Sequence, residues 1–480
     1  METIHLKTVD AASQELLRSA AQRGIDLNWE RYERQQPQDG FLRLGLACAY
    51  GCMQGPCRID PFGRGAATGL CGIGRDAMVA AFVLRLAVNG ALEAVNSAGK
   101  PGELPAPLWP EALRKLADKA VTTLGGGTLS VAEAFSGAAA LAHPGEPAPA
   151  LIRRALRLGL LTLGLSGARP SRASSGKVPF KIGSGVLADN RPTIGMCGTV
   201  TPQVADAIVQ AAGARMSVVS LGMWIGGKAV LPMACTSGEA ELVVSSGAIA
   251  AVVYGADADA AVPALCAKLG IPAFAAADVD ANEVIAAAAK AHGKCGFTAD
   301  ATQVAEGTLV ASAAIADALY ADKKRELAVI GGPDTVQQSL GYLATELPPP
   351  LIAADCTVAT WGDAALWMAK RSAVGSSVGA LALDDARGPL DALEAAVIAG
   401  GLERLRGILF TALRCTSDFA TALGAAALGA RVCVAQPLPL WGSEVTRETL
   451  AAAVRECGGA FAHFDHPATA DEIRSWFDQR

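Results

Sequence analysis

The sequence predicts an α/β protein in which a helical N-terminal domain with a cysteine-rich loop precedes two α/β domains. Three observations predict this class. Apolar residues recur at helical spacing from Arg75 to about Leu165. After Asn190, short β-branched runs alternate with alanine-rich helical segments, which is typical of parallel strands joined by helices. Four of the 12 cysteines fall between residues 48 and 71, which marks a specialised loop.

Composition limits the classes of partner. A chain of 480 residues with 51% apolar content has room for two to four domains with sizeable cores. The 41 basic and 46 acidic residues give a net charge of −5, so no nucleic-acid partner is expected. The longest apolar stretches, 158–165 and 248–254, are far shorter than the roughly 20 residues that span a bilayer. Residues 1–15 lack the apolar core of a secretory signal, and we expect a cytoplasmic protein without a membrane partner.

The first predicted domain comprises residues 1–190. Residues 11–23 form an amphipathic pattern that predicts a helix beside the cysteine loop. Residues 75–165 predict the helical body of the domain. Glycine, serine, proline and basic residues are frequent in 167–185, which predicts a linker or an extended surface crossing.

The second and third predicted domains comprise residues 191–324 and 325–480. The expected strands are 193–196, 217–221, 250–254, 272–275, 327–330, 351–354, 380–383, 408–411 and 432–435. The boundary is expected between Ala299 and Arg325, where an alanine-rich helical stretch separates the two sets of strands.

The cysteine-rich loop has the spacing Cys48-x3-Cys52-x4-Cys57-x13-Cys71. Glycines and a proline directly before Cys57 favour irregular backbone, which lets several thiolates converge and aims N–H groups at the sulfurs. An iron–sulfur cluster is the favoured interpretation. A structural zinc site is the main alternative, but its ligands are usually paired as short C-x2–4-C knuckles. Unliganded thiols are the third interpretation.

The segments 29–38, 51–63 and 69–72 together resemble the N-terminal region of the anaerobic nickel-iron carbon monoxide dehydrogenases, in the superfamily that includes the hybrid-cluster proteins. The resemblance implies a helical domain followed by two Rossmann-like α/β domains. It also implies that Cys48, Cys52, Cys57 and Cys71 hold a [4Fe-4S] electron-transfer cluster. The first spacing is x3 here, whereas the family has x2.

Other positions depart from the family. Two further cysteines, which in the family bridge the dimer through a shared cluster, correspond to Asp39 and Ala47. The resemblance therefore implies no intersubunit cluster, although a homodimer could persist through packing. The stretch 90–99 lacks the spaced histidines that the family uses near this position.

The nickel cluster of the family uses one histidine and five cysteines. Thr199 falls at the histidine position, and Met223 or Trp224 and then Ala258 fall at cysteine positions. Cys415 matches a ligand, the next position falls within 437–440, and the last lies beyond Arg480, as in a C-terminally shortened member. We expect no nickel cluster of the family's type, because each missing thiolate removes charge and a coordination position.

A second, altered cluster is one interpretation of the isolated cysteines. Cys197, Cys356 and Cys415 are each predicted at the carboxyl end of a strand, and Cys235 in a loop. Open α/β sheets build their sites at those ends. The alternative is that these cysteines are small buried apolar residues. We expect Cys266, Cys295, Cys433 and Cys457 to be structural.

These observations lead to three hypotheses. The first is a carbon monoxide dehydrogenase-like protein with one [4Fe-4S] cluster and a degenerate nickel site, acting in electron transfer or as a redox partner subunit. Its partner would be a ferredoxin-like protein or an enzyme subunit, in a homodimer or hetero-oligomer. The second is an oxidoreductase that acts on a small molecule at a remodelled cluster between the α/β domains. The third is a scaffold or maturation protein with a structural cluster.

Overall fold

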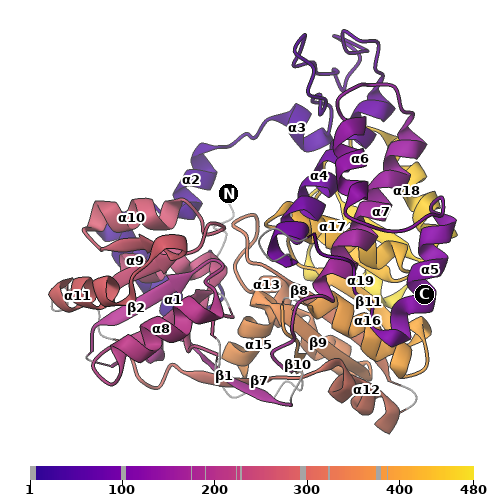
Figure 1. The fold of residues 1–480 in the computed structure, drawn as a ribbon. Coiled ribbons are helices and arrows are strands. Elements are labelled where there is room, and N and C mark those ends of the chain that lie inside the picture. Colours follow the sequence, from indigo (N-terminus) through magenta and orange to yellow (C-terminus); the bar gives the residue numbers. More distant parts are fainter. Residues whose placement is uncertain are drawn as a thin grey trace.

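The computed structural model describes residues 7–98, 104–173, 176–189, 191–222, 224–226, 230–291, 299–322, 325–373, 380–385 and 387–479. Figure 1 shows two α/β lobes side by side, with the N-terminal helices distributed over both. The α/β class with N-terminal helices, predicted from the sequence, is confirmed.

The N-terminal helices pack on different parts of the molecule. They are α1 (Ala11–Gln22), α2 (Asn28–Arg34), α3 (Gly40–Leu44), α4 (Arg75–Ala98), α5 (Arg114–Thr123), α6 (Ala132–Ala140) and α7 (Ala148–Ser166). The amphipathic segment forms α1, and the Asp10 carboxylate caps it by accepting a hydrogen bond from the Ser13 N–H at 2.9 Å. Helix α1 contacts α9 (Ala240–Ser245) of the first lobe. Helices α4 and α7 instead pack on α17 (Thr416–Ala427) of the second lobe.

One sheet of 13 strands runs through both lobes in the order β13-β12-β11-β8-β9-β10-β7-β1-β4-β3-β2-β5-β6. The first eight strands along the chain are β1 (Val178–Ile182), β2 (Thr193–Cys197), β3 (Ser217–Gly222), β4 (Met233–Thr236), β5 (Ile249–Tyr254), β6 (Ala273–Ala275), β7 (Ala305–Leu309) and β8 (Glu326–Gly332). The others are β9 (Cys356–Gly362), β10 (Ala380–Ala382), β11 (Leu405–Phe410), β12 (Arg431–Pro437) and β13 (Ala460–Phe464).

Each half of this sheet has Rossmann-like topology. In the first half the order β4-β3-β2-β5-β6 reverses direction between β2 and β5. In the second half the order β10-β9-β8-β11-β12-β13 reverses between β8 and β11. Neighbouring strands within each half are parallel, and only the pairing of β1 with β7 is antiparallel among the strand pairs of the described residues. Ligands of such sheets bind at the carboxyl ends of the strands where the order reverses.

The remaining helices connect the strands. In the first half they are α8 (Pro202–Ala212), α9, α10 (Ala261–Leu269) and α11 (Ala281–Ala291). In the second half they are α12 (Ser312–Ala321), α13 (Tyr342–Glu346), α14 (Pro348–Ala353), α15 (Asp363–Ala373), α16 (Gly388–Ile398), α17, α18 (Glu444–Glu456) and α19 (Ala470–Asp478).

Several sequence predictions about the strands need correction, and β4 and β13 are not among the expected strands. The stretch 167–185, expected as a linker or surface crossing, contains β1 in the middle of the sheet. The stretch 299–325, expected to be helical, contains β7 before α12. The strand expected at 351–354 is wrong, because Leu351 belongs to α14 and the strand begins at Cys356. Tertiary pairing, which local sequence does not encode, decides each of these cases.

The predicted domain boundaries, 190/191 and 324/325, stay a prediction. The antiparallel β1–β7 pair joins the two halves, with Val178 opposite Leu309 and Ile182 opposite Ala305. Across this pair the Phe180 ring lies over Gly307, where a Cβ would approach the ring to 2.2 Å. Phe180 also packs edge-on against Trp224, with ring centroids 4.6 Å apart. The join is thus a packed part of the core.

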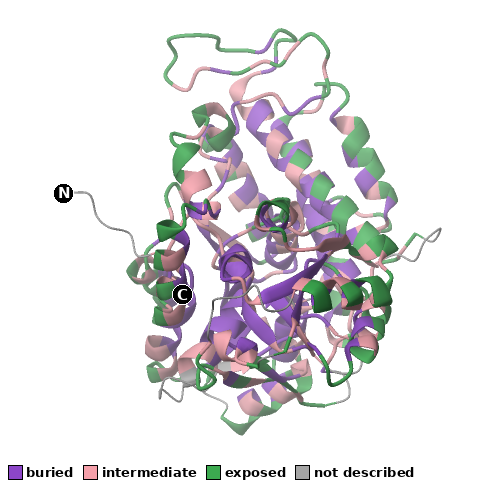
Figure 2. Cartoon of the chain, turned by 90° about the vertical axis from the view of Figure 1, so that its left-hand side faces the viewer, coloured by how far each residue is buried: buried purple, intermediate pink, exposed green. Residues whose placement is uncertain are grey.

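Figure 2 shows the sheet and its flanking helices as the buried centre of the molecule. Helix α4 is the one described helix long and apolar enough to cross a membrane by length and composition alone. Its residues Met78, Val83, Leu84 and Ala87 are fully buried, and it packs between α7 and α17. Burial of this kind is typical of a core helix.

Helices α7 and α17 cross at two facing glycines. A Cβ on Gly424 would lie 2.2 Å from the Gly159 carbonyl oxygen, and one on Gly159 would lie 2.6 Å from the Gly424 nitrogen. Backbone at this separation leaves no room for a side chain. The absence of side chains here therefore sets how closely the N-terminal helices approach the second lobe.

We predict that Gly424→Ala lowers the free energy of unfolding by about 1–3 kcal/mol, because the added methyl group forces α7 and α17 apart. Chemical denaturation monitored by circular dichroism measures this change. Gly145→Ala is the matched control, since a Cβ there meets nothing within 4 Å. Equal stability of both variants would contradict the close-contact interpretation.

Candidate functional site

The four loop cysteines lie between α3 and α4, in a segment that projects beyond the helices in Figure 1. The loop folds back on itself through a bridge between Ala47 and Arg58, where the Cys48 N–H donates to the Cys57 carbonyl oxygen at 2.8 Å. Cys48, Cys52 and Cys57 are half-buried and Cys71 is exposed. The loop is anchored from α4, where the Arg85 guanidinium donates to the Ala49 carbonyl oxygen at 3.1 Å.

The donors of this loop fit a thiolate-bound cluster. All described cysteines are free thiols, including these four. Two backbone N–H groups already donate to sulfurs at 3.4 Å, from Gln54 to Cys52 and from Leu70 to Cys57. Such N–H contacts stabilise anionic sulfur. No three His, Cys, Asp or Glu side chains among the described residues are gathered closely enough to hold a metal ion, so the fit rests on donor type, number and backbone.

The two positions that depart from the family have structural roles. Asp39 caps α3, because its carboxylate accepts hydrogen bonds from the N–H groups of Phe41 and Leu42 at 2.9 and 3.0 Å. Ala47 takes part in the bridge to Arg58. Neither residue offers a sulfur ligand at this position.

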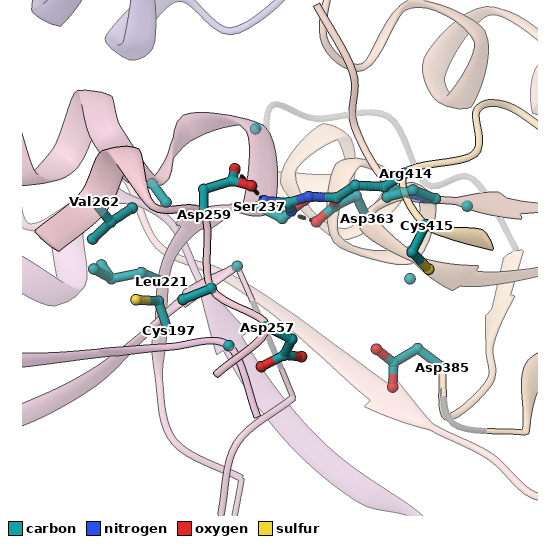
Figure 3. Close-up of a pocket in the computed structure, with 18 of the residues that line it drawn as sticks. Cys197, Leu221, Ser237, Asp257, Asp259, Val262, Asp363, Asp385, Arg414 and Cys415 are labelled. Carbon is teal, nitrogen blue, oxygen red and sulfur yellow. Dashed lines mark hydrogen bonds and ion pairs between the residues drawn. The ribbon is translucent and has the colours of Figure 1, made fainter. Parts of the chain in front are cut away.

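A cavity of about 340 Å³ lies between the two halves of the sheet, at the carboxyl ends of their strands. Both points of strand-order reversal open into it. In the first half Cys197 ends β2 and Asp257 follows β5. In the second half Gly332 ends β8 and Arg414 follows β11. Figure 3 shows Cys197 and Asp257 on one side of the cavity and Arg414 and Cys415 on the other. Gly222 ends β3 with φ of +84°, a left-handed conformation that lets the chain turn away sharply at the cavity wall.

Some of the sequence-predicted ligand positions meet at this cavity. Cys197, Cys415, Trp224 and Ala258 line it. Thr199 lies beside it and donates from its N–H and its hydroxyl group to the Asp257 carboxylate, at 2.5 and 2.7 Å. Met223 lies outside the described residues.

Cys235 and Cys356 do not join them. The sequence predicts Cys235 in a loop, but the residue lies inside β4 and is buried. Cys356 begins β9 and so lies at the amino end of the strand, where its sulfur accepts a hydrogen bond from the Arg406 guanidinium at 3.3 Å. The expectation that Cys356 ends a strand is therefore wrong, because residues 351–353 belong to α14 and the strand starts at Cys356. A cluster on all four scattered cysteines is not supported by these positions.

The remaining isolated cysteines agree with a structural role where they are described. Cys266, Cys433 and Cys457 are buried in helix α10, in strand β12 and at the end of α18. Cys295 lies outside the described residues.

The two thiols at the cavity are held in the neutral form. Burial, and then the nearby Cys266 and Asp257, raise the pKa of Cys197 to about 12. Desolvation of the thiol, and secondly the negative charge of Asp418, raise the pKa of Cys415 to about 12. Both thiols are therefore protonated at neutral pH. They are the two sulfur-bearing side chains of the described lining, fewer than the four that a cubane cluster takes.

Carboxylates are the prominent side chains of the cavity, and the sequence analysis missed them. Those in its lining are Glu93, Glu241, Asp257, Asp259, Asp363, Asp385 and Asp418. A sequence signal was present, because Asp257, Asp363 and Asp385 each follow a strand within three residues. Residues in this position face the crevice of an open parallel sheet.

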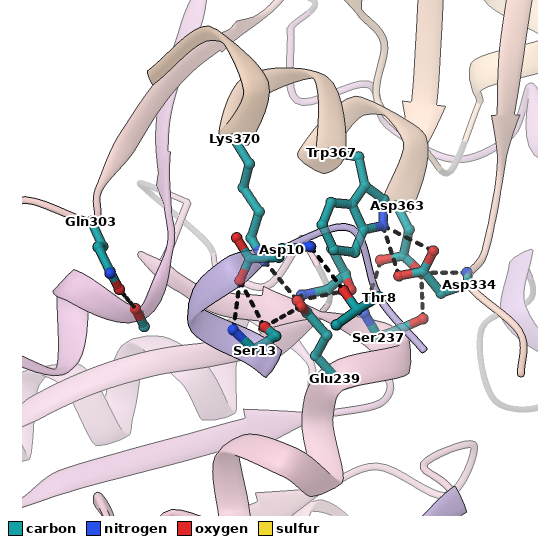
Figure 4. Close-up of polar contacts among 12 residues, drawn as sticks. Thr8, Asp10, Ser13, Ser237, Glu239, Gln303, Asp334, Asp363, Trp367 and Lys370 are labelled. Atoms are coloured by element: carbon teal, nitrogen blue, oxygen red, sulfur yellow. Dashed lines mark hydrogen bonds and ion pairs between the residues drawn. The ribbon is translucent and has the colours of Figure 1, made fainter. Parts of the chain in front are cut away.

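A buried polar network adjoins the cavity through Ser237 and Asp363, which belong to the cavity lining (Figure 4). The Ser237 N–H and hydroxyl groups donate to Asp363, the first bond at 2.9 Å, and the Asp334 N–H donates to Asp363 at 2.8 Å. The Trp367 indole N–H donates to Asp334 at 2.9 Å. Desolvation, and then the negative charge of Asp363, raise the pKa of Asp334. The network therefore fixes the start of α15 relative to β4.

An ion pair in the same network ties α1 to both halves. The Lys370 ammonium lies 2.7 Å from Glu239, and the Ser13 hydroxyl group of α1 donates to the same carboxylate at 2.5 Å. The side chains of Lys370 and Glu239 are 12% and 1% exposed. Desolvation opposes the charge of Lys370, but Glu239 and Asp10 outweigh it and raise its pKa, so the lysine stays protonated.

Comparison with known proteins identifies relatives. No family model matches the chain. A segment of 90 residues is 48% identical to carbon monoxide dehydrogenase 1 of Methanosarcina mazei, covering 19% of this chain and 14% of that protein. A segment of 81 residues is 48% identical to carbon monoxide dehydrogenase of Rhodospirillum rubrum, covering 17% and 12%. The matches thus span well under two thirds of the length of these relatives.

Solved structures share the fold over the whole chain. Carbon monoxide dehydrogenase IV from Carboxydothermus hydrogenoformans superposes with a TM-score of 0.77 and 18% identity over 98% of both chains. The nickel-free carbon monoxide dehydrogenase from Thermococcus sp. AM4 gives a TM-score of 0.76 and 17% identity over 98% of this chain and 96% of that one. The resemblance inferred from the sequence is confirmed.

We predict that Lys370→Met lowers the free energy of unfolding by about 3–5 kcal/mol, because it leaves the Glu239 carboxylate buried without its cation. The double variant Glu239→Gln with Lys370→Met should recover part of the loss, since no buried charge then remains unpaired. Guanidinium denaturation measures both. Lys181→Met is the control, because its pair with Glu306 is exposed and should change stability little. A loss at Lys370 no larger than at Lys181 would refute the assignment.

Proposed function

We propose that this chain, which belongs to the carbon monoxide dehydrogenase family, is an iron–sulfur protein that carries one [4Fe-4S] cluster and exchanges electrons with a redox partner. The observation that carries the proposal is the set of four free thiols in the loop 45–74. Cys48, Cys52, Cys57 and Cys71 would hold the cluster. When bound, such a cluster supplies one-electron transfer.

The residues of the loop would tune and protect this centre. The N–H groups of Gln54 and Leu70 donate to sulfurs, which stabilises negative charge on them. Arg75 holds the loop by donating to the carbonyl oxygens of Asp60 and Pro61 at 3.0 and 3.2 Å. These contacts keep the cysteine backbone in place when the oxidation state changes.

The surface around the loop favours contact with another protein. Met53, Phe62 and Leu70 are large apolar residues with 97%, 78% and 73% of their surface exposed. Exposed apolar groups beside a redox centre suit a partner that approaches closely. We propose that this partner is a ferredoxin-like protein, an enzyme subunit or a second copy of the chain.

The residues that line the cavity favour a role without the family's nickel chemistry. Among the described residues of its lining, Cys197 and Cys415 are the two that carry sulfur, fewer than the four thiolates of a cubane cluster. The positions that correspond to the family's other ligands include Trp224 and Ala258, which offer no thiolate. The proposal therefore places redox chemistry at the N-terminal loop.

We predict that anaerobically purified protein contains about four irons and four acid-labile sulfides per chain, as one cubane requires. Dithionite reduction should give one electron paramagnetic resonance signal of spin one half. Cys52→Ser should abolish the signal and most of the iron, because it removes one of four ligands.

The matched control is Cys266→Ser, which changes a buried cysteine far along the chain from the loop. It should leave iron and the signal intact. About eight irons per chain, or iron that partly survives Cys52→Ser and is lost on Cys415→Ala, would instead support a second cluster at the cavity. A cluster that ferredoxin-type partners neither reduce nor oxidise would support the scaffold or maturation role.

A further inference from the structure

The cysteine loop carries positive charge on a protein that is acidic overall. The whole chain has a net charge of −5, yet residues 40–75 contain four arginines, one aspartate and no lysine, glutamate or histidine. Three of these arginines, Arg43, Arg58 and Arg64, are exposed. None of the three takes part in an ion pair among the described residues. The loop therefore presents cationic groups that no described carboxylate pairs with.

The two carboxylates closest in sequence to these arginines are engaged by backbone groups. Asp39 caps α3. Asp60, the one acidic residue of the loop, is half-buried and accepts hydrogen bonds from the N–H groups of Arg64 and Gly65, the second at 3.0 Å. The exposed charged side chains within residues 40–74 are thus all arginines.

Apolar side chains lie among the arginines and beside the cysteines. Met53, Arg58 and Leu70 are each the direct chain neighbour of one loop cysteine. Phe62 lies in the turn that follows Arg58, and like Met53 and Leu70 it is largely exposed. Figure 2 shows the loop at the top of the molecule, mainly in the colours of exposed and intermediate residues. The surface next to the cysteines therefore combines large apolar groups with positive charge.

Helix α3 belongs to the same surface. The Arg58 guanidinium lies over the Phe41 ring of α3, 4.5 Å from the ring centroid. The same helix carries Arg43 in its last turn. Stacking uses the face of a guanidinium and leaves the N–H groups at its edge available to acceptors. Arg58 is thus held in place while it can still donate to another molecule.

We infer that this loop surface binds an acidic electron-transfer protein. The loop surface is defined as Arg43, Met53, Arg58, Phe62, Arg64 and Leu70. The inference rests on the proposed function, because the partner has to approach a cluster held by the loop. A cluster with four thiolates is anionic, and an acidic partner brings further negative charge, so cationic groups between them are needed. The arginines supply that charge, and the apolar groups supply contact area from which water is excluded.

The charge of the loop surface disfavours two other occupants. A twofold dimer through this loop would place the same surface of each copy face to face, so arginines would lie opposite arginines. A membrane is usually bound by an amphipathic helix. The segment between α3 and α4, by contrast, is irregular. An acidic protein is therefore the occupant that the charge and the backbone favour.

Binding measurements on the full chain, loaded with its cluster under anaerobic conditions, test the inference. The probes are an acidic ferredoxin and an acidic flavodoxin, with the basic mitochondrial cytochrome c as their cationic counterpart. Biolayer interferometry should give a Kd below about 100 µM for at least one acidic probe at about 20 mM salt. Salt at about 300 mM should weaken this binding about tenfold, because counterions screen exposed charges. Cytochrome c should not bind.

Two double variants separate the charged from the apolar contribution. Arg43→Gln with Arg64→Gln should weaken binding about tenfold at low salt and flatten the salt dependence, because two cationic contacts are lost. Met53→Ser with Phe62→Ser should weaken binding at both salt concentrations and keep the salt dependence, because only apolar contacts are lost. All four side chains are exposed, and thermal melting checks the fold of each variant.

The matched control is Arg18→Gln with Arg23→Gln. It removes two exposed arginines at α1, which packs on α9 of the first lobe. This variant should bind like the parent. The inference is overturned if neither acidic probe binds, if cytochrome c binds as tightly, or if the variant without Arg43 and Arg64 binds like the parent.

Other occupants would give different results. Phosphatidylglycerol vesicles that bind the parent more tightly than the acidic probes do would overturn the inference in favour of a membrane surface. A dimer in light scattering that the substitutions at Met53 and Phe62 dissociate would overturn it in favour of a second copy.

Iron and acid-labile sulfide in the same samples separate this inference from the proposed function. Protein without a cluster would overturn both. Protein with about four irons per chain that binds neither acidic probe would overturn the inference alone.

Discussion

The antiparallel pairing of β1 with β7 is the interaction on which the rest of the structure depends. All other strand pairs in the described sheet are parallel, so this pair is where one Rossmann-like half joins the other. Phe180 packs across the pair onto Gly307 and edge-on against Trp224. Because Trp224 also lines the cavity, the packing that joins the halves also shapes the space between them. The carboxyl ends of strands from both halves then border one site.

Polar groups that are buried where the two halves meet have hydrogen-bond partners close by. Carboxylates near the cavity accept hydrogen bonds from backbone N–H groups and hydroxyl groups, as Asp363 and Asp418 do. The Lys370–Glu239 pair and Ser13 connect helix α1 to both halves. An unpaired charge would be costly there, so this network fixes the relative positions of its elements. Glu241 differs in one respect, because its buried Oε2 has no hydrogen-bond partner.

The chain separates two environments that differ in chemistry. The N-terminal loop offers sulfur donors, N–H groups directed at sulfur, and an exposed apolar surface. The cavity offers oxygen acceptors, neutral thiols and aromatic walls. Soft, electron-rich sulfur ligands favour metal clusters, whereas carboxylate oxygens are hard ligands. At the two positions near the loop that differ from the family, Asp39 caps a helix and Ala47 forms a backbone bridge.

The sequence by itself determined the α/β class, the N-terminal helices, most of the parallel strands and the resemblance to carbon monoxide dehydrogenases. These properties are local, because periodicity of 3.6 or 2, β-branched runs and closely spaced cysteines are readable within short windows. Only the tertiary structure decided that β1 and β7 pair in the middle of the sheet, that Cys356 lies at the amino end of β9, and that Asp257 and Asp385 face one cavity. Those outcomes depend on pairing and packing between residues far apart in the chain. Local sequence indicates at most that Asp257 and Asp385 follow strands, and it does not specify which strands lie side by side.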